Sequence, residues 1–382
     1  MTGGGGGKRR RAAYGAAAAT LLLLAGCTTT PHETGTQGVR RLLDRWAAAV
    51  RDKNENAYLD AVDPAAERYR ADRRRVYANL AALPLATWEY RLKSLKGATA
   101  DAQLRYRIAG YGAATATVSV RLTVARHGDR WYVTGQDATR AGNQLWEQGT
   151  LTAVHGTSAL VLGVDQDRGR LQELAGLADR AVPAVTAAWP GPWSRRVVVE
   201  LPATLDRMAA LLDSPPSKYR GIAAVTTEDR IVVNPEAYAE LGDFGRRIVL
   251  THETTHAATR DATTRSTPMW LSEGFADWVA YRGAARTPRQ VAPELAAAVT
   301  AGTPPDRLPP DADFAFTGDA GRLARAYEGG WLACRLIAER WGEERLVALY
   351  RAAGRGGRFW DALGVSEADF TAQWREYVAE AF

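Results

Sequence analysis

The stretch His252-Glu253-Thr254-Thr255-His256 lies inside a segment, 242–259, that is predicted to be helical with Asp243 at its N-cap. Two histidines four residues apart lie on one helical face, so both imidazoles can bind a single zinc ion. Glu253 lies beside that pair, where its carboxylate can take a proton from a water that a metal activates. A surface histidine pair on an ordinary helix would have the same spacing, so the surrounding sequence must decide between the two.

A third ligand is expected from the next helix. Glu273 follows His256 by seventeen residues, in a segment that Pro268 is predicted to open as the first helical residue. A catalytic zinc needs three protein ligands and an open fourth position, and Glu273 completes that set. Asp277 lies one turn further on the same face, where it can accept a hydrogen bond from a zinc-binding histidine. The alternative for both acids is a solvated charge on a helix surface.

The combination of His-Glu-x-x-His with Trp270-Leu271-Ser272-Glu273-Gly274-Phe275-Ala276 resembles the gluzincin zinc metallopeptidases. It is similar to the aminopeptidase N catalytic domain and to the peptidase-MA-like domains of secreted bacterial proteins. The resemblance implies that His252, His256 and Glu273 bind zinc and that Glu253 is the general base. The step from Glu273 to Asp277 is more like thermolysin, where the aspartate supports a zinc histidine.

A second match to the aminopeptidase N group is Tyr327-Glu328-Gly329-Gly330. In that group a Tyr-x-x-Gly tyrosine stabilises the tetrahedral intermediate through its hydroxyl. The resemblance therefore implies that Tyr327 is an oxyanion donor opposite the zinc. An aromatic packing residue is the alternative for this position.

The chain departs from the aminopeptidases upstream of these motifs. Their Gly-x-Met-Glu-Asn strand carries a glutamate that binds the free amine of the substrate. The corresponding stretch here is Gly221-Ile222-Ala223-Ala224, which keeps the glycine and lacks the glutamate. Such a strand can still pair with an extended peptide through main-chain hydrogen bonds. The sequence therefore favours an endopeptidase over an aminopeptidase.

The predicted fold class is α+β, in two domains. Residues 39–140 show helical spacing and then alternating strands, which favours an α+β domain that resembles the nuclear-transport-factor-2-like (NTF2-like) fold. Residues 150–382 form the predicted gluzincin domain: a zincin-type α/β subdomain over 150–265, then a helical subdomain over 266–382 that carries the Glu273 helix. Strands are expected at 159–162, 196–201, 222–225 and 231–233, and C-terminal helices at 295–299, 323–341, 343–351 and 366–382.

The N-terminus has the pattern of a bacterial export signal over 1–26. Four basic residues, 8–11, precede a fourteen-residue apolar region that is too short for a stable membrane span. Leu24-Ala25-Gly26-Cys27 resembles a lipobox, in which the cysteine is lipidated and becomes the new N-terminus. A cleaved signal with an incidental cysteine and an uncleaved anchor are the alternatives, and both the general and the twin-arginine export routes stay open. Residues 27–38 are expected to form a tether.

Composition excludes several classes of protein. With 46% hydrophobic and 24% charged residues and only two cysteines, the chain is neither disordered nor a disulfide scaffold. The formal net charge is +6, of which Lys8, Arg9, Arg10 and Arg11 contribute +4. Removal of residues 1–26 leaves +2, so no nucleic-acid partner is expected. Cys334, in an apolar helical run, is expected to be buried.

These observations predict a zinc metallopeptidase with one zinc ion per chain, anchored by lipid at Cys27 on the extracytoplasmic face of the cell membrane. Its partner would be a peptide or protein substrate. Three alternatives stay open: a non-catalytic binding lipoprotein with a peptidase-like fold, a zinc hydrolase of another bond, and another divalent ion at the same ligands.

Overall fold

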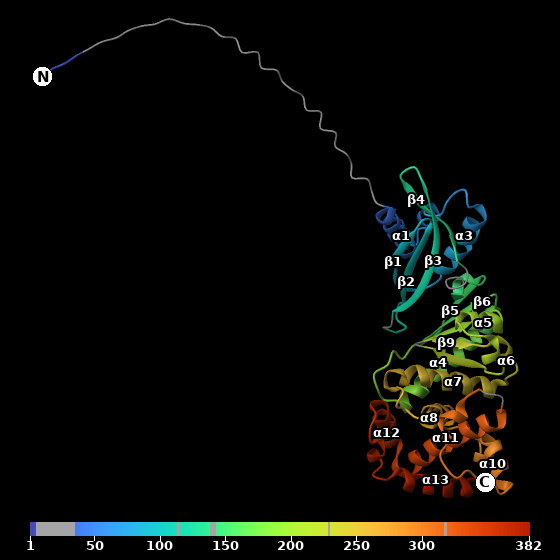
Figure 1. Cartoon of the computed structure of the whole chain (residues 1–382). Coiled ribbons are helices and arrows are strands. Elements are labelled where there is room, and N and C mark those ends of the chain that lie inside the picture. The colour runs from blue at the N-terminus through green and yellow to red at the C-terminus, as the bar shows by residue number, and fades with distance from the viewer. Residues whose placement is uncertain (5–34, 113–114, 138–142, 228–229, 317–318) are drawn as a thin grey trace. The chain divides into compact units, whose positions relative to one another are not determined.

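The computed structural model describes residues 1–4, 35–112, 115–137, 143–227, 230–316 and 319–382 (Figure 1). The predicted signal peptide, apart from its first four residues, and Cys27 lie outside these ranges. Residues 35–382 form one compact unit. In the described part of the chain, no helix is long and apolar enough to cross a membrane.

The unit begins with three helices and an antiparallel sheet of four strands in the order β1-β2-β3-β4. The helices are α1 (Gly35–Arg51), α2 (Glu55–Asp60) and α3 (Glu67–Ala81), and the strands are β1 (Leu85–Lys96), β2 (Thr99–Ile108), β3 (Ala116–His127) and β4 (Arg130–Gln136). Apolar residues at helical spacing along α1 are buried, Leu42, Leu43 and Trp46 among them. The sequence predicts this order, in which helices are followed by an antiparallel meander. The NTF2-like resemblance stays a prediction.

The predicted tether is too long by four residues. Residues 35–38 form the first turn of α1, and Gly38 is buried there. A Cβ atom on Gly35 would lie 3.4 Å from the ring of Trp131 in β4, so this turn packs against the sheet and cannot act as a spacer.

A second sheet has the strand order β5-β6-β7-β9-β8. Its elements are η1 (Leu145–Glu147), β5 (Leu151–His155), β6 (Ala159–Val164), α4 (Arg168–Ala188), β7 (Val197–Leu201), α5 (Leu205–Leu211), η2 (Pro216–Lys218), β8 (Ala224–Thr227), β9 (Arg230–Val233), α6 (Pro235–Ala239) and α7 (Asp243–Thr259). Strands β6, β7 and β9 are parallel, and antiparallel β5 and β8 form the two edges. Strands β8 and β9, which overlap the strands predicted at 222–225 and 231–233, therefore pair with each other at one edge.

Both faces of the second sheet are covered. Alternate residues of a strand point to opposite faces. Val161 and Val199 pack with α4 and α7, whereas Leu160 and Val198 share one hydrophobic core with the first three helices and the first sheet. The helical layer on one face and the first part of the chain on the other make the sheet a middle layer.

A set of charged residues, the Arg73 cluster (Asp72, Arg73 and Glu147), joins α3 to η1. The Arg73 guanidinium donates to Glu147 Oε1 at 2.9 Å and to Asp72 Oδ2 at 2.6 Å. Six residues further along α3, the Asn79 amide donates to the Trp146 carbonyl at 2.8 Å. The segment that precedes β5 is thus fixed to α3 by hydrogen bonds.

The remaining chain is helical. Its elements are η3 (Arg260–Ala262), α8 (Met269–Tyr281), α9 (Pro288–Val291), α10 (Pro293–Thr300), η4 (Asp311–Phe314), α11 (Ala320–Trp341), α12 (Glu343–Arg355), η5 (Phe359–Ala362) and α13 (Glu367–Ala381). Helices α8 and α11 pack against each other (Figure 1). Pro268 is the N-cap of α8, with ψ 143°, so the prediction that it is the first helical residue is off by one. Cys334 is fully buried, as predicted.

The fold is therefore mixed, with two sheets and a helical C-terminal region, which agrees with the predicted α+β class. The active-site candidates of the sequence fall on α7, α8 and α11, and the edge strand β8 lies against α7. These four elements build the site described next.

Candidate active site

Helix α7 carries His252, Glu253 and His256. Threonine is a weak helix former, but the buried face of α7 uses it at regular intervals. Thr251 Oγ1 donates to the Arg247 carbonyl at 2.9 Å and Thr255 Oγ1 donates to the Thr251 carbonyl at 2.8 Å. The buried Thr251 and Thr255 hydroxyls are thereby satisfied by the preceding turn of their own helix.

The three predicted ligands meet at one point. His252 Nε2 lies 3.0 Å from His256 Nε2 and 3.2 Å from Glu273 Oε2, and His256 Nε2 lies 3.3 Å from that same oxygen. One ligand atom from each residue lies within 4.8 Å of the other two, and this is the one such group among the described residues. Two imidazoles and a carboxylate are the donor set of a catalytic zinc. The metal group (His252, His256 and Glu273) therefore fits zinc.

Two glycines let α8, which carries Glu273, approach α11 closely. A Cβ atom on Gly274, the residue after Glu273, would lie 2.2 Å from the carbonyl oxygen of Gly330 in α11. A Cβ atom on Gly330 would in turn lie 2.7 Å from the Trp270 carbonyl oxygen in α8. Only residues without a side chain allow this approach, and α11 also carries Tyr327. The glycines of both sequence motifs thus set the distance between the helices that hold the site.

Asp277 lies where the sequence predicts it. Its Oδ1 is 2.8 Å from His252 Nδ1, the ring nitrogen opposite the one that faces the metal group. A hydrogen bond there fixes the ring orientation and leaves Nε2 as the ligand atom. Burial lowers the pKa of His252, but the neighbouring Asp277 and Glu273 outweigh burial, and the pKa is raised well above its usual value.

Glu273 is buried between the two histidines. Burial raises the pKa of its carboxyl, but the attraction of His256 and the hydrogen bonds from both rings outweigh burial, and the pKa is lowered. The carboxylate form, which is the form that binds a metal, is thereby the stable one at neutral pH.

Glu253 is 7% exposed and lies in the same cavity as the metal group. Thr226 Oγ1, from β8, is 2.7 Å from Glu253 Oε2 and 2.9 Å from its main-chain carbonyl oxygen. The edge strand therefore orients the carboxylate through one hydroxyl. No sequence pattern indicates this contact, since it depends on how β8 lies against α7.

Tyr327 lines that cavity from α11. Its ring centroid lies 6.3 Å from that of His252 and 5.3 Å from that of Phe314. Burial, and then the nearby carboxylates of Glu273, Asp277 and Glu253, raise its pKa well above the usual value. The phenol therefore keeps its proton and is a hydrogen-bond donor at neutral pH.

The predicted substrate strand is only half correct. Strand β8 begins at Ala224, whereas Gly221, Ile222 and Ala223 precede it. Gly221 has a φ of +82°, a left-handed conformation that turns the chain there and ends extended pairing. Ile222 and Ala224 nonetheless line the cavity, together with Val225 and Thr226. The side of β8 away from β9 is an open edge of the sheet.

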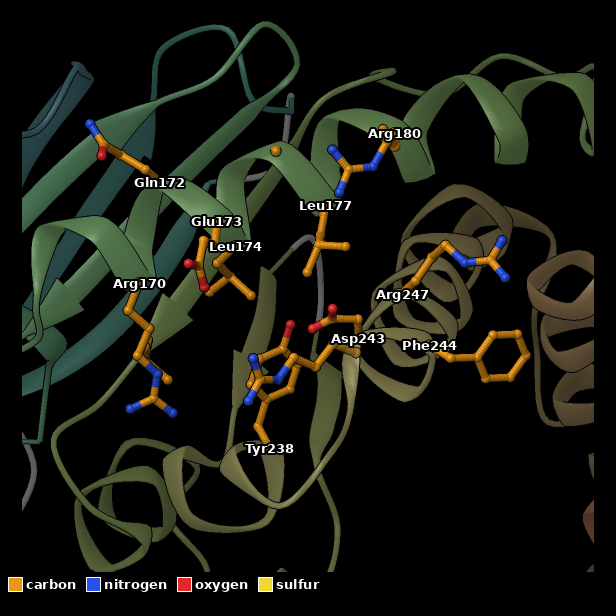
Figure 2. Close-up of a pocket in the computed structure, with 13 residues that line it drawn as sticks. Arg170, Gln172, Glu173, Leu174, Leu177, Arg180, Tyr238, Asp243, Phe244 and Arg247 are labelled. Carbon is orange, nitrogen blue, oxygen red and sulfur yellow. The ribbon is translucent and has the colours of Figure 1, made fainter.

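The cavity with the metal group has a volume of about 350 Å³. A larger one, about 860 Å³, lies between α4 and the start of α7. Figure 2 shows Arg170, Leu177 and Arg180 on one wall, facing Tyr238 and Asp243. No histidine or cysteine lines this larger groove, so its size does not make it the catalytic site.

No family model and no curated protein matches the chain. Solved structures with some similarity are M1 zinc metallopeptidases. One, a two-domain mutant enzyme bound to L-arginine, has a TM-score of 0.33 and 15% identity over 67% of this chain and 57% of its own. The enzyme from Deinococcus radiodurans has a TM-score of 0.32 and 16% identity over 74% of this chain and 60% of its own. The chain thus spans less than two thirds of either structure, and both overall similarities are low.

Proposed function

We propose that the protein is a zinc-dependent metallopeptidase that hydrolyses peptide bonds. The convergence of His252, His256 and Glu273 ligand atoms beside the Glu253 carboxylate, in one open cavity, carries this proposal. A zinc ion bound by the three ligands would supply Lewis-acid chemistry that activates a water and polarises a carbonyl. The hydrogen bond from His252 to Asp277 supports such a ligand set.

The protein side chains have separate roles in the reaction. Glu253, oriented by Thr226, takes the proton of the attacking water and later delivers it to the leaving amine. The Tyr327 hydroxyl donates a hydrogen bond to the carbonyl oxygen of the scissile bond as negative charge develops on it. Each of these groups lines the cavity that the metal group opens into.

An endopeptidase fits this cavity better than an aminopeptidase. The carboxylates among its described lining residues are Glu253 and Glu273, and both already have roles. No further acid is left there to bind a free amine. The open edge of β8 can pair with the middle of an extended peptide, which has no charged end to accommodate.

The test compares the full chain, supplied with zinc, with two variants. The native chain should hold about one zinc ion, and Glu273→Ala should lose most of it. Glu253→Gln should keep the zinc and lose peptide hydrolysis by on the order of 10²–10⁴-fold, because only proton transfer is removed. Glu240→Gln, an exposed glutamate before α7, is the matched control. A well-folded chain that binds no zinc would rule out the proposal and leave a binding protein.

We also propose that Cys27 is lipidated and that the chain functions on the extracytoplasmic side of the membrane. Support comes from the sequence pattern of residues 8–27 alone. Cys27→Ala should move the protein from the detergent phase to the aqueous phase in a detergent partition of cells. Unchanged partition would contradict lipidation at this residue.

A further inference from the structure

Arg260 continues the face of α7 that carries the two histidines. His252, His256 and Arg260 follow one another at intervals of four residues, and each interval advances about 6 Å along the helix. Arg260 is the C-cap of α7 and keeps helical backbone angles, φ −45° and ψ −48°. Its side chain lines the cavity of the metal group.

This arginine is the one cationic side chain among the described residues that line the cavity. It forms an ion pair with Asp261, the next residue, at 3.3 Å from Nη2 to Oδ1. The two side chains are 39% and 83% exposed, respectively. An ion pair that is so exposed to water contributes little to the stability of the fold. The Arg260 guanidinium can therefore exchange Asp261 for the carboxylate of a ligand.

Other residues that line the cavity are apolar. Ile222, Val225, Met269 and Phe314 line it, together with Phe316. Phe316 is 56% exposed, and Met1 is the only other large exposed hydrophobic residue in the described ranges. An exposed aromatic side chain at the edge of a cavity is typical of a contact that a ligand completes.

We propose that Arg260 forms a carboxylate-binding subsite in this cavity and that the preferred substrates are peptides with a carboxylate close to the scissile bond and an apolar side chain beside it. This inference rests on the proposed function and names its substrate class. A guanidinium binds a carboxylate through two parallel N–H donors, an arrangement that neutral side chains do not match. An extended peptide advances about 3.3 Å per residue. The interval of about 6 Å from His256 to Arg260 along α7 therefore corresponds to about two residues of substrate.

The carboxylate has two possible sources, the side chain of Asp or Glu and the C-terminus of the peptide. Both present the same two oxygens to Arg260, and they differ only in where the peptide ends. A substrate that binds through its C-terminus would be cleaved close to that end. A substrate that binds through a side chain would be cleaved at an internal acidic position.

The test measures peptide binding to the zinc-supplied full chain with Glu253→Gln, so that the peptide is not consumed. Fluorescent five-residue peptides carry Phe at the centre, Glu or Gln scanned over the other positions, and a free or amidated C-terminus. We expect one charged peptide to bind on the order of tenfold more tightly than its neutral match. If the Glu peptide binds more tightly than the Gln peptide whether or not the C-terminus is amidated, the carboxylate comes from a side chain. If the peptide with a free C-terminus binds more tightly than its amide, the carboxylate is the C-terminus.

Variants in the same background assign the preference. Arg260→Gln should remove it and leave the neutral peptide bound as before, whereas Arg260→Lys should retain part of it. Arg265→Gln, on the exposed loop that follows, should retain all of it. Phe316→Ala should weaken charged and neutral peptides alike. Equal binding of charged and neutral peptides, a preference that survives Arg260→Gln, or no binding of any peptide would each overturn the subsite.

The two proposals fail separately. Hydrolysis of the same peptides is followed with native Glu253. Hydrolysis without a charge preference would contradict the Arg260 subsite and leave the peptidase function standing. An Arg260-dependent preference in binding, without hydrolysis of any peptide, would contradict the peptidase function and leave the subsite standing.

Discussion

The Arg73 cluster and the metal group are both sets of polar side chains that are largely shielded from water, but their polar atoms point in different directions. Arg73 lies between two carboxylates, and each charge has a protein partner of opposite sign. In the metal group, three lone-pair atoms face one another across about 3 Å, and the site opens into a cavity. The first arrangement pairs opposite charges within the protein, whereas the second gathers ligand atoms that could hold a metal ion.

The largest effect on stability is expected from breaking the complete cluster. Arg73→Met leaves the buried Glu147 carboxylate without its partner, which should lower the free energy of unfolding by about 4 kcal/mol. Denaturant unfolding of the full chain measures it. Arg74→Met, an exposed neighbour whose ion pair with Glu55 is 3.4 Å long, should cost less than about 1 kcal/mol. Equal losses in the two variants would show that the Arg73 cluster is not a structural element.

The next prediction concerns the glycines that hold the metal group together. In Gly274→Ala the new methyl group would overlap the Gly330 backbone, and α8 and α11 must separate. We expect a loss of about 3 kcal/mol in the free energy of unfolding and weaker zinc binding, since Glu273 moves with α8. Gly176→Ala is the control, because its Cβ atom would have ordinary contact distance, 3.5 Å, to Arg180. Unchanged zinc affinity in Gly274→Ala would show that this approach does not position the ligand.

A smaller effect is expected from Asp277→Asn. The amide oxygen can still accept the hydrogen bond from His252 Nδ1, but the negative charge beside the ring is lost. Zinc affinity should fall by about 10–100-fold without loss of folding. Competition with a chelator of known affinity gives the value. A variant with native zinc affinity would mean that Asp277 has no part in the site.

The smallest effect is expected from Glu328, a third buried charge. Its carboxylate accepts from the Leu295 main-chain N–H at 2.6 Å and from that of Glu294 at 3.2 Å. Burial raises the pKa of Glu328 to about 7, against the lowering effect of these two bonds. The folded state therefore holds this proton up to a higher pH than the unfolded state, and stability falls as pH rises from about 4.5 to 7.

Glu328→Gln removes this titration. Between pH 5 and pH 7.5 the native chain should lose about 1–2 kcal/mol more unfolding free energy than the variant. Denaturant unfolding at the two pH values measures the difference. If the unfolding free energies of both proteins changed equally with pH, the pH dependence would come from groups other than Glu328.

Local signals in the sequence predict most elements and the metal group. The predicted helix over 242–259 is α7, with Gly242 and not Asp243 as its N-cap. The spacing of His252 and His256 on one helix, taken together with the motif around Glu273 on the next, predicted this group. The helix predicted over 366–382 is α13, and Ser366 at its N-cap accepts from the Asp369 N–H at 3.1 Å.

What the sequence did not reveal depends on contacts between distant segments. The bond from Thr226 to Glu253 requires that β8 is an edge strand lying against α7. The place of Arg260 in the cavity follows from how far α7 continues past His256. The left-handed conformation of Gly221, which shortens β8, is set by the turn that precedes it. Of these, the contact from Thr226 to Glu253 has no pattern within a short window of sequence, whereas the spacing of four residues from His256 to Arg260 is such a pattern.

The middle position of the second sheet has a consequence for how the chain can be divided. Leu160, Leu162 and Val198 are covered by residues that come earlier in the chain. A fragment that starts at residue 150 would expose this apolar face to water and would be prone to aggregate. The part of the chain that carries the metal group therefore shares its core with the first sheet, and a truncated chain would need that sheet or another covering for this face.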